Sequence, residues 1–115
     1  MPFITIEMPD SVQFELAPFA GAMHKAISSS LDIPIEKLKT KLVRYQDVFV
    51  GIGDPAHTYA NIELSLMQGR DKQKLKSCLE ALLANFKEAL ERQNPGLQCR
   101  VTVNVHELDR ELLKS

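Results

Sequence analysis

The sequence carries one hydrophobicity pattern twice: an alternating segment, then a helical segment, then a second alternating segment. Pro2-Phe3-Ile4-Thr5-Ile6 matches Ala60-Asn61-Ile62-Glu63-Leu64 at an offset of 58 residues. A period of two predicts a strand and a period near 3.6 predicts a helix. Two parallel strands joined by a helix form a right-handed βαβ unit. We therefore expect an α+β fold, a doubled βαβ (βαββαβ) with a four-stranded sheet and both helices on one face.

Four segments are expected to form the strands. Turn residues separate them, since Pro9-Asp10-Ser11 and Gly51-Ile52-Gly53-Asp54-Pro55 break the alternation. Alternating apolar residues in each segment should face the core, and polar residues should face away from it. The expected strands are Phe3 to Met8, Leu38 to Val50, Tyr59 to Met67, and a last strand in which Cys99, Val101, Val103 and Val105 share one face.

Two helices are expected between these strands. The first begins around Pro18, which suits a first helical turn, and is closed by Ser28-Ser29-Ser30 and Pro34. The second follows Gly69 and ends at Asn94-Pro95-Gly96, and its apolar face is long. That face comprises Leu75, Cys78, Leu79, Leu82, Leu83, Phe86 and Leu90, and residues Glu107 to Ser115 form a charged tail compatible with a further helix.

The composition excludes several classes of function. A chain of 115 residues is expected to form one domain, residues 1–115. Its net charge of −1 gives no reason to expect nucleic acid or an anionic membrane surface as a partner. Because the chain has neither a long apolar run nor the features of a signal peptide, we expect a cytoplasmic protein. Cys78 and Cys99 have no metal-site spacing and are expected to be buried thiols.

The N-terminus is the first candidate for chemistry. Met1 is readily removed when a small residue follows, and the chain would then begin with the secondary amine of Pro2. An α-amino group has a pKa of about 7.7 to 8.0, and burial or neighbouring positive charge lowers that value. Pro2 is therefore a candidate general base.

The exposed face of the second strand supplies candidate anion binders. Lys39 and Lys41 share this face with Val43 and Tyr45, so the face is either solvated or packed against other subunits. His57 and His106 have no partner at catalytic or ligand spacing and are interpreted as structural. No metal site is expected.

Taken in order, several short motifs resemble the 5-carboxymethyl-2-hydroxymuconate isomerases of the tautomerase superfamily. The motifs are Met1-Pro2 before a strand, Ile33-Pro34-Ile35 before Leu38-Lys39-Thr40-Lys41, His57-Thr58-Tyr59-Ala60 leading into the third strand, and Gly69-Arg70-Asp71 opening the second helix. The resemblance covers nearly the whole chain. It implies a homotrimer, no metal or organic cofactor, and a catalytic N-terminal proline that moves a proton in an unsaturated keto acid. A small carboxylate would be the substrate.

The chain also departs from that family's pattern. Lys39 and Lys41 occupy positions where the family has arginines, so a two-point carboxylate fork is replaced by a point charge. We expect Lys39 or Lys41 to bind the substrate carboxylate, with Arg44 and Arg70 as other possible anion binders. The C-terminal extension is shorter than in the family, and the loop around Gly51 to Pro55 is longer.

A noncatalytic role is the alternative hypothesis. A βαββαβ order also suits an oligomeric small-molecule-binding protein of the same fold, or a ferredoxin-like binding module. The state of the N-terminus separates the two hypotheses, because a retained Met1 would place Pro2 in a peptide bond and abolish its basicity.

Overall fold

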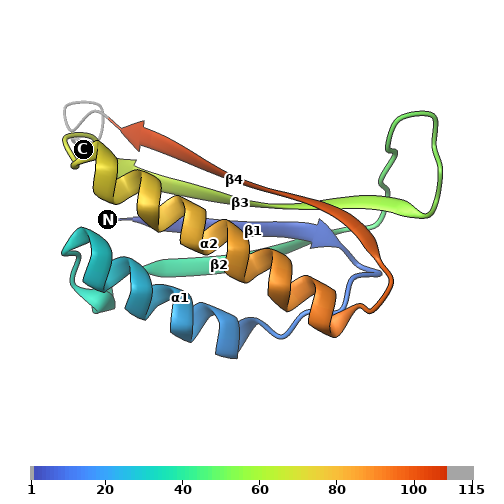
Figure 1. The fold of residues 1–115 in the computed structure, drawn as a ribbon, viewed down its shortest axis with the longest axis horizontal. Helices are drawn as coiled ribbons and strands as arrows, with labels where there is room; N and C mark the ends of the chain where they lie inside the picture. The colour runs from blue at the N-terminus through green and yellow to red at the C-terminus, as the bar shows by residue number, and fades with distance from the viewer. Residues whose placement is uncertain (1, 109–115) are drawn as a thin grey trace.

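A computed structural model describes residues 2–108 and contains one sheet and two long helices (Figure 1). The strands lie in the order β2-β1-β3-β4. Both helices cover the same face of the sheet, which leaves the other face open. In chain order, the elements are β1 (Phe3–Pro9), α1 (Leu16–Leu31), a short 3-10 helix η1 (Ile35–Lys37), β2 (Lys39–Tyr45), β3 (His57–Met67), α2 (Lys72–Gln93) and β4 (Gln98–Leu108).

The strand pairing confirms the doubled βαβ arrangement. Strands β1 and β2 are parallel, as are β3 and β4, whereas β1 and β3 are antiparallel at the centre of the sheet. Thr5 pairs with Glu63, and these two residues are also 58 positions apart in the sequence. The repeat in the sequence is therefore an approximate two-fold relation between two halves of one sheet.

The core lies between the sheet and the helices. Ile4 and Ile6 of β1 and Ile62 and Leu64 of β3 are fully buried, as their alternation predicts. Phe86 of α2 is also fully buried, and its ring contacts the rings of Phe14 and Phe19 with centroids 5.9 and 5.6 Å away. This aromatic cluster joins both helices to the segment that follows β1.

The first helix is longer than expected. Ser28, Ser29 and Ser30 lie inside α1 instead of closing it, and the helix ends at Leu31 because Asp32 adopts a left-handed conformation with φ of 54°. The Ser28 hydroxyl donates a hydrogen bond of 2.6 Å to the Ile33 carbonyl. Ser28 therefore anchors the chain that leaves the helix.

Three element boundaries correct the expectations from sequence. Strand β2 ends at Tyr45 and not at Val50, and residues 46–56 form a loop that projects beyond the sheet (Figure 1). Strand β3 begins at His57, two residues earlier than expected. Strand β4 continues through Leu108, so Glu107 belongs to a strand and not to a tail. The rest of the expected tail lies outside the described residues.

The long second helix has the expected apolar face, with one exception. Leu75, Cys78, Leu82 and Phe86 are buried, but Leu83 is 37% exposed at the edge of that face. Cys78 is buried and Cys99 is half-buried, and neither forms a disulfide. Burial raises the pKa of both thiols. Among residues 2–108, no helix is long and apolar enough to cross a membrane.

Candidate active site

Pro2 lies immediately before β1, at the end of the sheet opposite the projecting loop (Figure 1). Its side chain is buried. Alternation along the strand gives Pro2 the same orientation as Ile4 and Ile6, which face the helices. The pyrrolidine ring is therefore placed against the edge of the apolar core.

Lys39 is the candidate anion binder nearest to Pro2 in the strand register. It pairs with Phe3, the residue next to Pro2, whereas Lys41 pairs with Thr5, two residue pairs further along the strands. Both lysines are exposed on the open face, as expected. The Lys39 Nζ atom lies 5.2 Å from the centroid of the Phe3 ring, a cation–π contact that holds the ammonium at this end of β1.

Arg44 has a structural role. Its guanidinium donates hydrogen bonds to the carbonyls of Pro9 at 3.1 Å, Val12 at 2.7 Å and Phe14 at 3.5 Å. These bonds fasten the segment between β1 and α1 to the edge strand β2. Because its donors are engaged by backbone oxygens, Arg44 is a poor candidate for anion binding.

Arg70 differs from Arg44 because one of its buried donors has no partner. Its Nη1 atom donates to the Leu31 carbonyl at 3.0 Å, but its buried Nε atom makes no hydrogen bond with any described residue. Arg70 follows the end of β3, and that end pairs with the start of β1 through Ser65 and Phe3. Arg70 and Pro2 therefore lie at the same end of the sheet.

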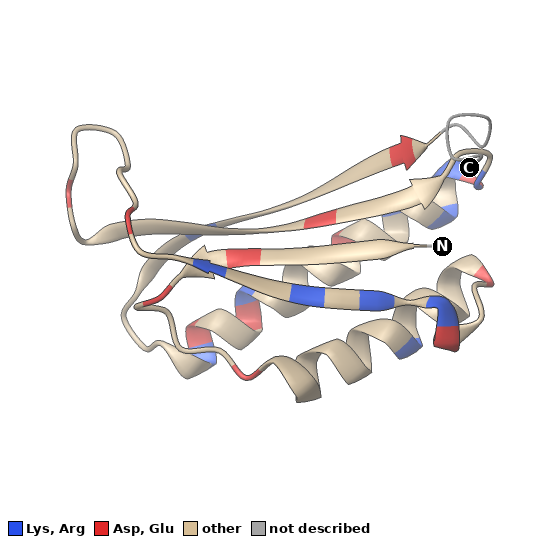
Figure 2. Ribbon diagram, turned by 180° about the vertical axis from the view of Figure 1, so that it is seen from behind, with Lys and Arg blue, Asp and Glu red and all other residues tan. Residues whose placement is uncertain are grey.

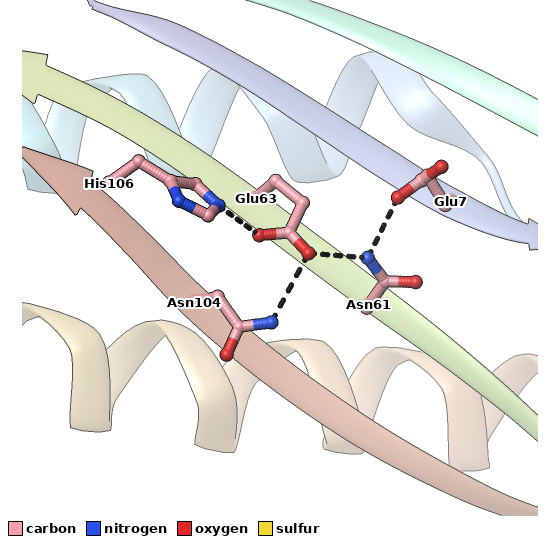
Figure 3. Close-up of polar contacts among 5 residues, drawn as sticks. All are labelled: Glu7, Asn61, Glu63, Asn104 and His106. Atoms are coloured by element: carbon pink, nitrogen blue, oxygen red, sulfur yellow. Dashed lines mark hydrogen bonds and ion pairs between the residues drawn. The ribbon is translucent and has the colours of Figure 1, made fainter.

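A polar network occupies the open face of the sheet (Figure 3). The Glu63 carboxylate accepts hydrogen bonds from Asn61 at 3.2 Å and Asn104 at 3.2 Å, and contacts the His106 ring at 2.8 Å. Asn61 also donates to Glu7 at 2.9 Å. The network therefore joins the three strands β1, β3 and β4.

The network lowers the pKa of the Glu63 carboxyl group. Partial burial alone would raise the pKa of this carboxyl group. The hydrogen bonds from His106, Asn104 and Asn61, together with the charge of His106, outweigh that effect and hold the pKa of Glu63 below its usual value. His106 thus has a carboxylate partner that the sequence analysis missed, because the pair becomes visible only when β3 and β4 are placed in register.

Four cavities of the described chain lie away from Pro2. A cavity of about 480 Å³ lies between α1 and α2, where Phe19, Met23 and Leu82 form part of its wall. The walls of these four cavities include neither Pro2 nor Lys39 nor Lys41. Within the same residues, no cluster of three histidine, cysteine or acidic side chains is arranged to hold a metal ion.

A doubled βαβ sheet with a proline ahead of its central strand defines the chain as a tautomerase-fold protein. The chain belongs to the 5-carboxymethyl-2-hydroxymuconate isomerase family, whose model matches residues 2–115. This confirms the resemblance in the motifs, and family membership makes the chain an isomerase. No curated protein sequence matches it.

Solved structures show the same fold at low sequence identity. A 5-carboxymethyl-2-hydroxymuconate isomerase from Deinococcus radiodurans R1 is 16% identical, with a TM-score of 0.84 over 99% of this chain and 87% of that chain. A 5-carboxymethyl-2-hydroxymuconate delta-isomerase is 12% identical, with a TM-score of 0.80 over 100% and 87% of the two chains. A fused 4-OT, described as a wild-type asymmetric trimer, is 16% identical, with a TM-score of 0.72 over 95% and 88%.

Proposed function

We propose that this protein moves a proton within an unsaturated 2-hydroxy or 2-oxo carboxylate, with the amine of Pro2 as the general base. Removal of Met1 would free that amine. The observation that carries the proposal is the placement of a buried Pro2 directly before Phe3, the residue that pairs with Lys39 in the neighbouring strand.

The position of Pro2 suits proton transfer. An amine at the edge of an apolar core, with lysine charge nearby, is easier to deprotonate than a solvated one, because both effects disfavour its charged form. The neutral amine takes a proton from the substrate and returns it at another carbon, so one group can serve both steps. The chemistry requires no change in the oxidation state of any group.

Two cations at this end of the sheet would bind the substrate. Lys39 carries a charge fixed over Phe3, and Arg70 has a buried Nε donor that no described residue satisfies. One can hold the carboxylate while the other stabilises charge on the developing enolate oxygen. Lys41 lies two residue pairs further from Pro2 and is assigned the weaker contribution.

We also propose that the active protein is a homotrimer. The open sheet face carries Phe3, Val43 and Tyr59 in exposed positions, an apolar content that suits a subunit interface. The edge strands β2 and β4 have backbone groups free to pair with neighbours. Closed rotational symmetry would limit such pairing, and three fused 4-OT structures with this fold are described as trimers.

The first test combines an intact mass with an assay. The mass of protein from the native host should be lower by one methionine, and this protein should accelerate ketonisation of a simple 2-hydroxydienoate or of phenylenolpyruvate. Activity should fall on the acid side as the Pro2 amine is protonated. Full activity of a Pro2→Ala variant would show that the base is another group. A retained Met1 in active protein would exclude the amine, and a retained Met1 in inactive protein would favour the noncatalytic binding role.

A further inference from the structure

The cavity between α1 and α2 is a groove on the helix layer that the proposed function does not use. Its volume is about 480 Å³, which lies within the range of about 300 to 1,000 Å³ that is common for small-molecule sites. The two helices run side by side on one face of the sheet (Figure 1), and Pro2 is not part of the groove wall. A molecule bound in the groove would therefore not contact Pro2.

The floor of the groove is apolar. Phe19 and Met23 of α1 and Leu82 of α2 contribute to it, and both Met23 and Leu82 are buried. The Cys78 thiol is also part of the wall, and burial raises its pKa, so this group is uncharged at neutral pH. Covering apolar surface removes it from water, which is favourable. The floor therefore suits an apolar molecule or the apolar part of one.

Alanines keep the groove open. Ala22 and Ala26 of α1 and Ala81 of α2 line its sides, and all three are exposed. A larger side chain at any of these positions would occupy part of the volume. Because alanine is also the best helix former, this stripe does not by itself identify a ligand. The class of ligand follows instead from the charged groups at one end of the groove.

Charged groups gather where α1 begins and α2 ends. Lys25 is the only charged residue in the sequence of α1, whereas the last turns of α2 carry both acidic and basic residues (Figure 2). Among the described residues, the groove wall includes the carboxylates of Glu15 and Glu88, the guanidinium of Arg92 and no lysine. The wall is therefore net negative, which favours a cation over an anion.

Both carboxylates are accessible to a ligand. Glu88 Oε1 lies 3.9 Å from Arg92 Nη1 and both side chains are largely exposed, so this ion pair contributes little. The Glu15 carboxylate does not cap α1. The Glu15 amide donates a hydrogen bond of 2.9 Å to the Gln93 side chain, which joins the two helices at the charged end of the groove. A groove bounded in this way suits a small molecule better than a long partner helix.

We propose that the groove between α1 and α2 binds a small amphipathic amine. Its apolar body would lie on Phe19, Met23 and Leu82, and its ammonium group would lie at the end that carries Glu15 and Glu88. The apolar floor, the bounded end and the net negative wall all support this class of ligand. The inference is independent of the proposed function, because such binding requires no free amine at Pro2.

Two matched probes test the ligand class by calorimetric titration at pH 7. 4-Phenylbutylamine and 4-phenylbutan-1-ol share one apolar body and differ only in the head group. The amine should bind with a Kd of about 1 mM or tighter. The alcohol should bind about threefold more weakly, because it lacks the charge that the exposed carboxylates attract. An amine that binds no more tightly than the alcohol, or that does not bind at about 10 mM, would overturn the proposal.

Substitutions in the groove test the location. The double variant Ala26→Leu/Ala81→Leu fills the groove from both helices and should weaken amine binding at least about tenfold. The matched control Ala84→Leu, at an exposed position of α2 outside the groove wall, should change the Kd less than about twofold. Equal effects of the two would place the amine elsewhere. Leucine is a good helix former, and circular dichroism would check that both variants fold.

Amide chemical shifts provide a second measurement of location that needs no variant. On addition of 4-phenylbutylamine to the wild type, the largest changes should occur in residues 18–30 and 78–93, which contain most of the groove wall. The largest changes in any other part of the chain would contradict the proposed site.

Charge variants test the position of the ammonium group. Glu88→Gln should weaken binding of the amine about threefold and leave binding of the alcohol unchanged. The matched control Glu91→Gln, an exposed glutamate of α2 outside the groove wall, should affect neither probe. Equal effects of the two substitutions on the amine would show that Glu88 does not hold the head group.

Pro2→Ala separates this inference from the proposed function. The variant should bind 4-phenylbutylamine with an unchanged Kd, whether or not the wild type is an active isomerase. Loss of amine binding in Pro2→Ala would mean that the amine occupies the Pro2 site, and the groove would then not be the site. Unchanged binding by a wild type that shows no isomerase activity would refute the proposed function alone.

Discussion

At the scale of single residues, position relative to Pro2 separates the two candidate lysines. Lys39→Ala should raise the KM for carboxylate substrates about tenfold, because it removes the charge held beside the start of β1. Lys41→Ala should have a smaller effect, since Lys41 lies two residue pairs further away. Steady-state kinetics on both variants would check this order, and the reverse order would assign the carboxylate to Lys41.

Stability provides the control for these substitutions. An exposed strand lysine contributes little to folding, so both variants should unfold within about 0.5 kcal/mol of the wild type. A loss of stability that parallels the loss of activity would point to a structural role for the lysine.

The polar network predicts a pH-dependent effect on stability. The pKa of Glu63 is lower in the folded chain than its usual value, so its contribution is present above about pH 4.3 and disappears as the pH falls through the lowered value. Glu63→Gln should reduce the melting temperature near pH 7 by about 2 to 4 °C. The difference from wild type should vanish in strong acid. A constant difference across this range would mean that shape, and not charge, accounts for the effect.

The candidate site was only partly predictable from sequence, and the reason lies in particular residues. The two strands of a βαβ unit are parallel, so the starts of β1 and β2, with Pro2 and the lysines, could be placed at one end of the sheet, whereas the choice between Lys39 and Lys41 needed the register. The pairing of His106 with Glu63 depends on how β3 aligns with β4 across a long helix. Glu63 and His106 are 43 residues apart in the sequence, so no local sequence pattern predicts that they pair.

At the scale of elements, Asn94 joins the end of α2 to the segment before α1. Its side chain donates to the Gln13 and Leu90 carbonyls at 2.8 and 2.9 Å and accepts from the Gln13 amide at 2.8 Å. Asn94→Ala would leave the Gln13 amide and carbonyl to solvent and remove one of the two hydrogen bonds to the Leu90 carbonyl, at a cost of about 1 kcal/mol. Urea unfolding would measure the loss.

The control for Asn94 is an exposed residue on the same helix. Lys87→Ala should change the free energy of unfolding by less than about 0.5 kcal/mol. Equal effects of the two substitutions would show that the Asn94 bonds do not contribute as proposed.

Element type was predictable and element length was not. Residues 46–50 are as rich in apolar residues as a strand, yet β2 ends at Tyr45 because β1, its neighbour, ends at Pro9. A strand needs a partner for its backbone groups, and the local sequence does not report where that partner stops. For α1, by contrast, the helix expected from sequence was too short. Serine favours helix ends, but Ser28 lies inside α1, where its hydroxyl donates a hydrogen bond to the chain that follows the helix.

At the scale of the whole molecule, we predict that the particle in solution has three times the 12.9 kDa mass of the chain. Light scattering coupled to size exclusion at micromolar concentration should detect it. Dilution that separates the copies should abolish catalysis even where the chains stay folded, because each site would lose its neighbour. A monomer that remains fully active would contradict both the trimer and the shared site.

The near two-fold relation within the sheet limits how many bases each chain can carry. The position equivalent to Pro2 at an offset of 58 residues is Ala60, which lies inside β3 and is buried. A peptide bond precedes Ala60, so proteolytic removal of a single residue can never expose an amine there. Under the proposed function, the repeat therefore doubles the framework without doubling the chemistry, because only the half that contains Pro2 can present an amine.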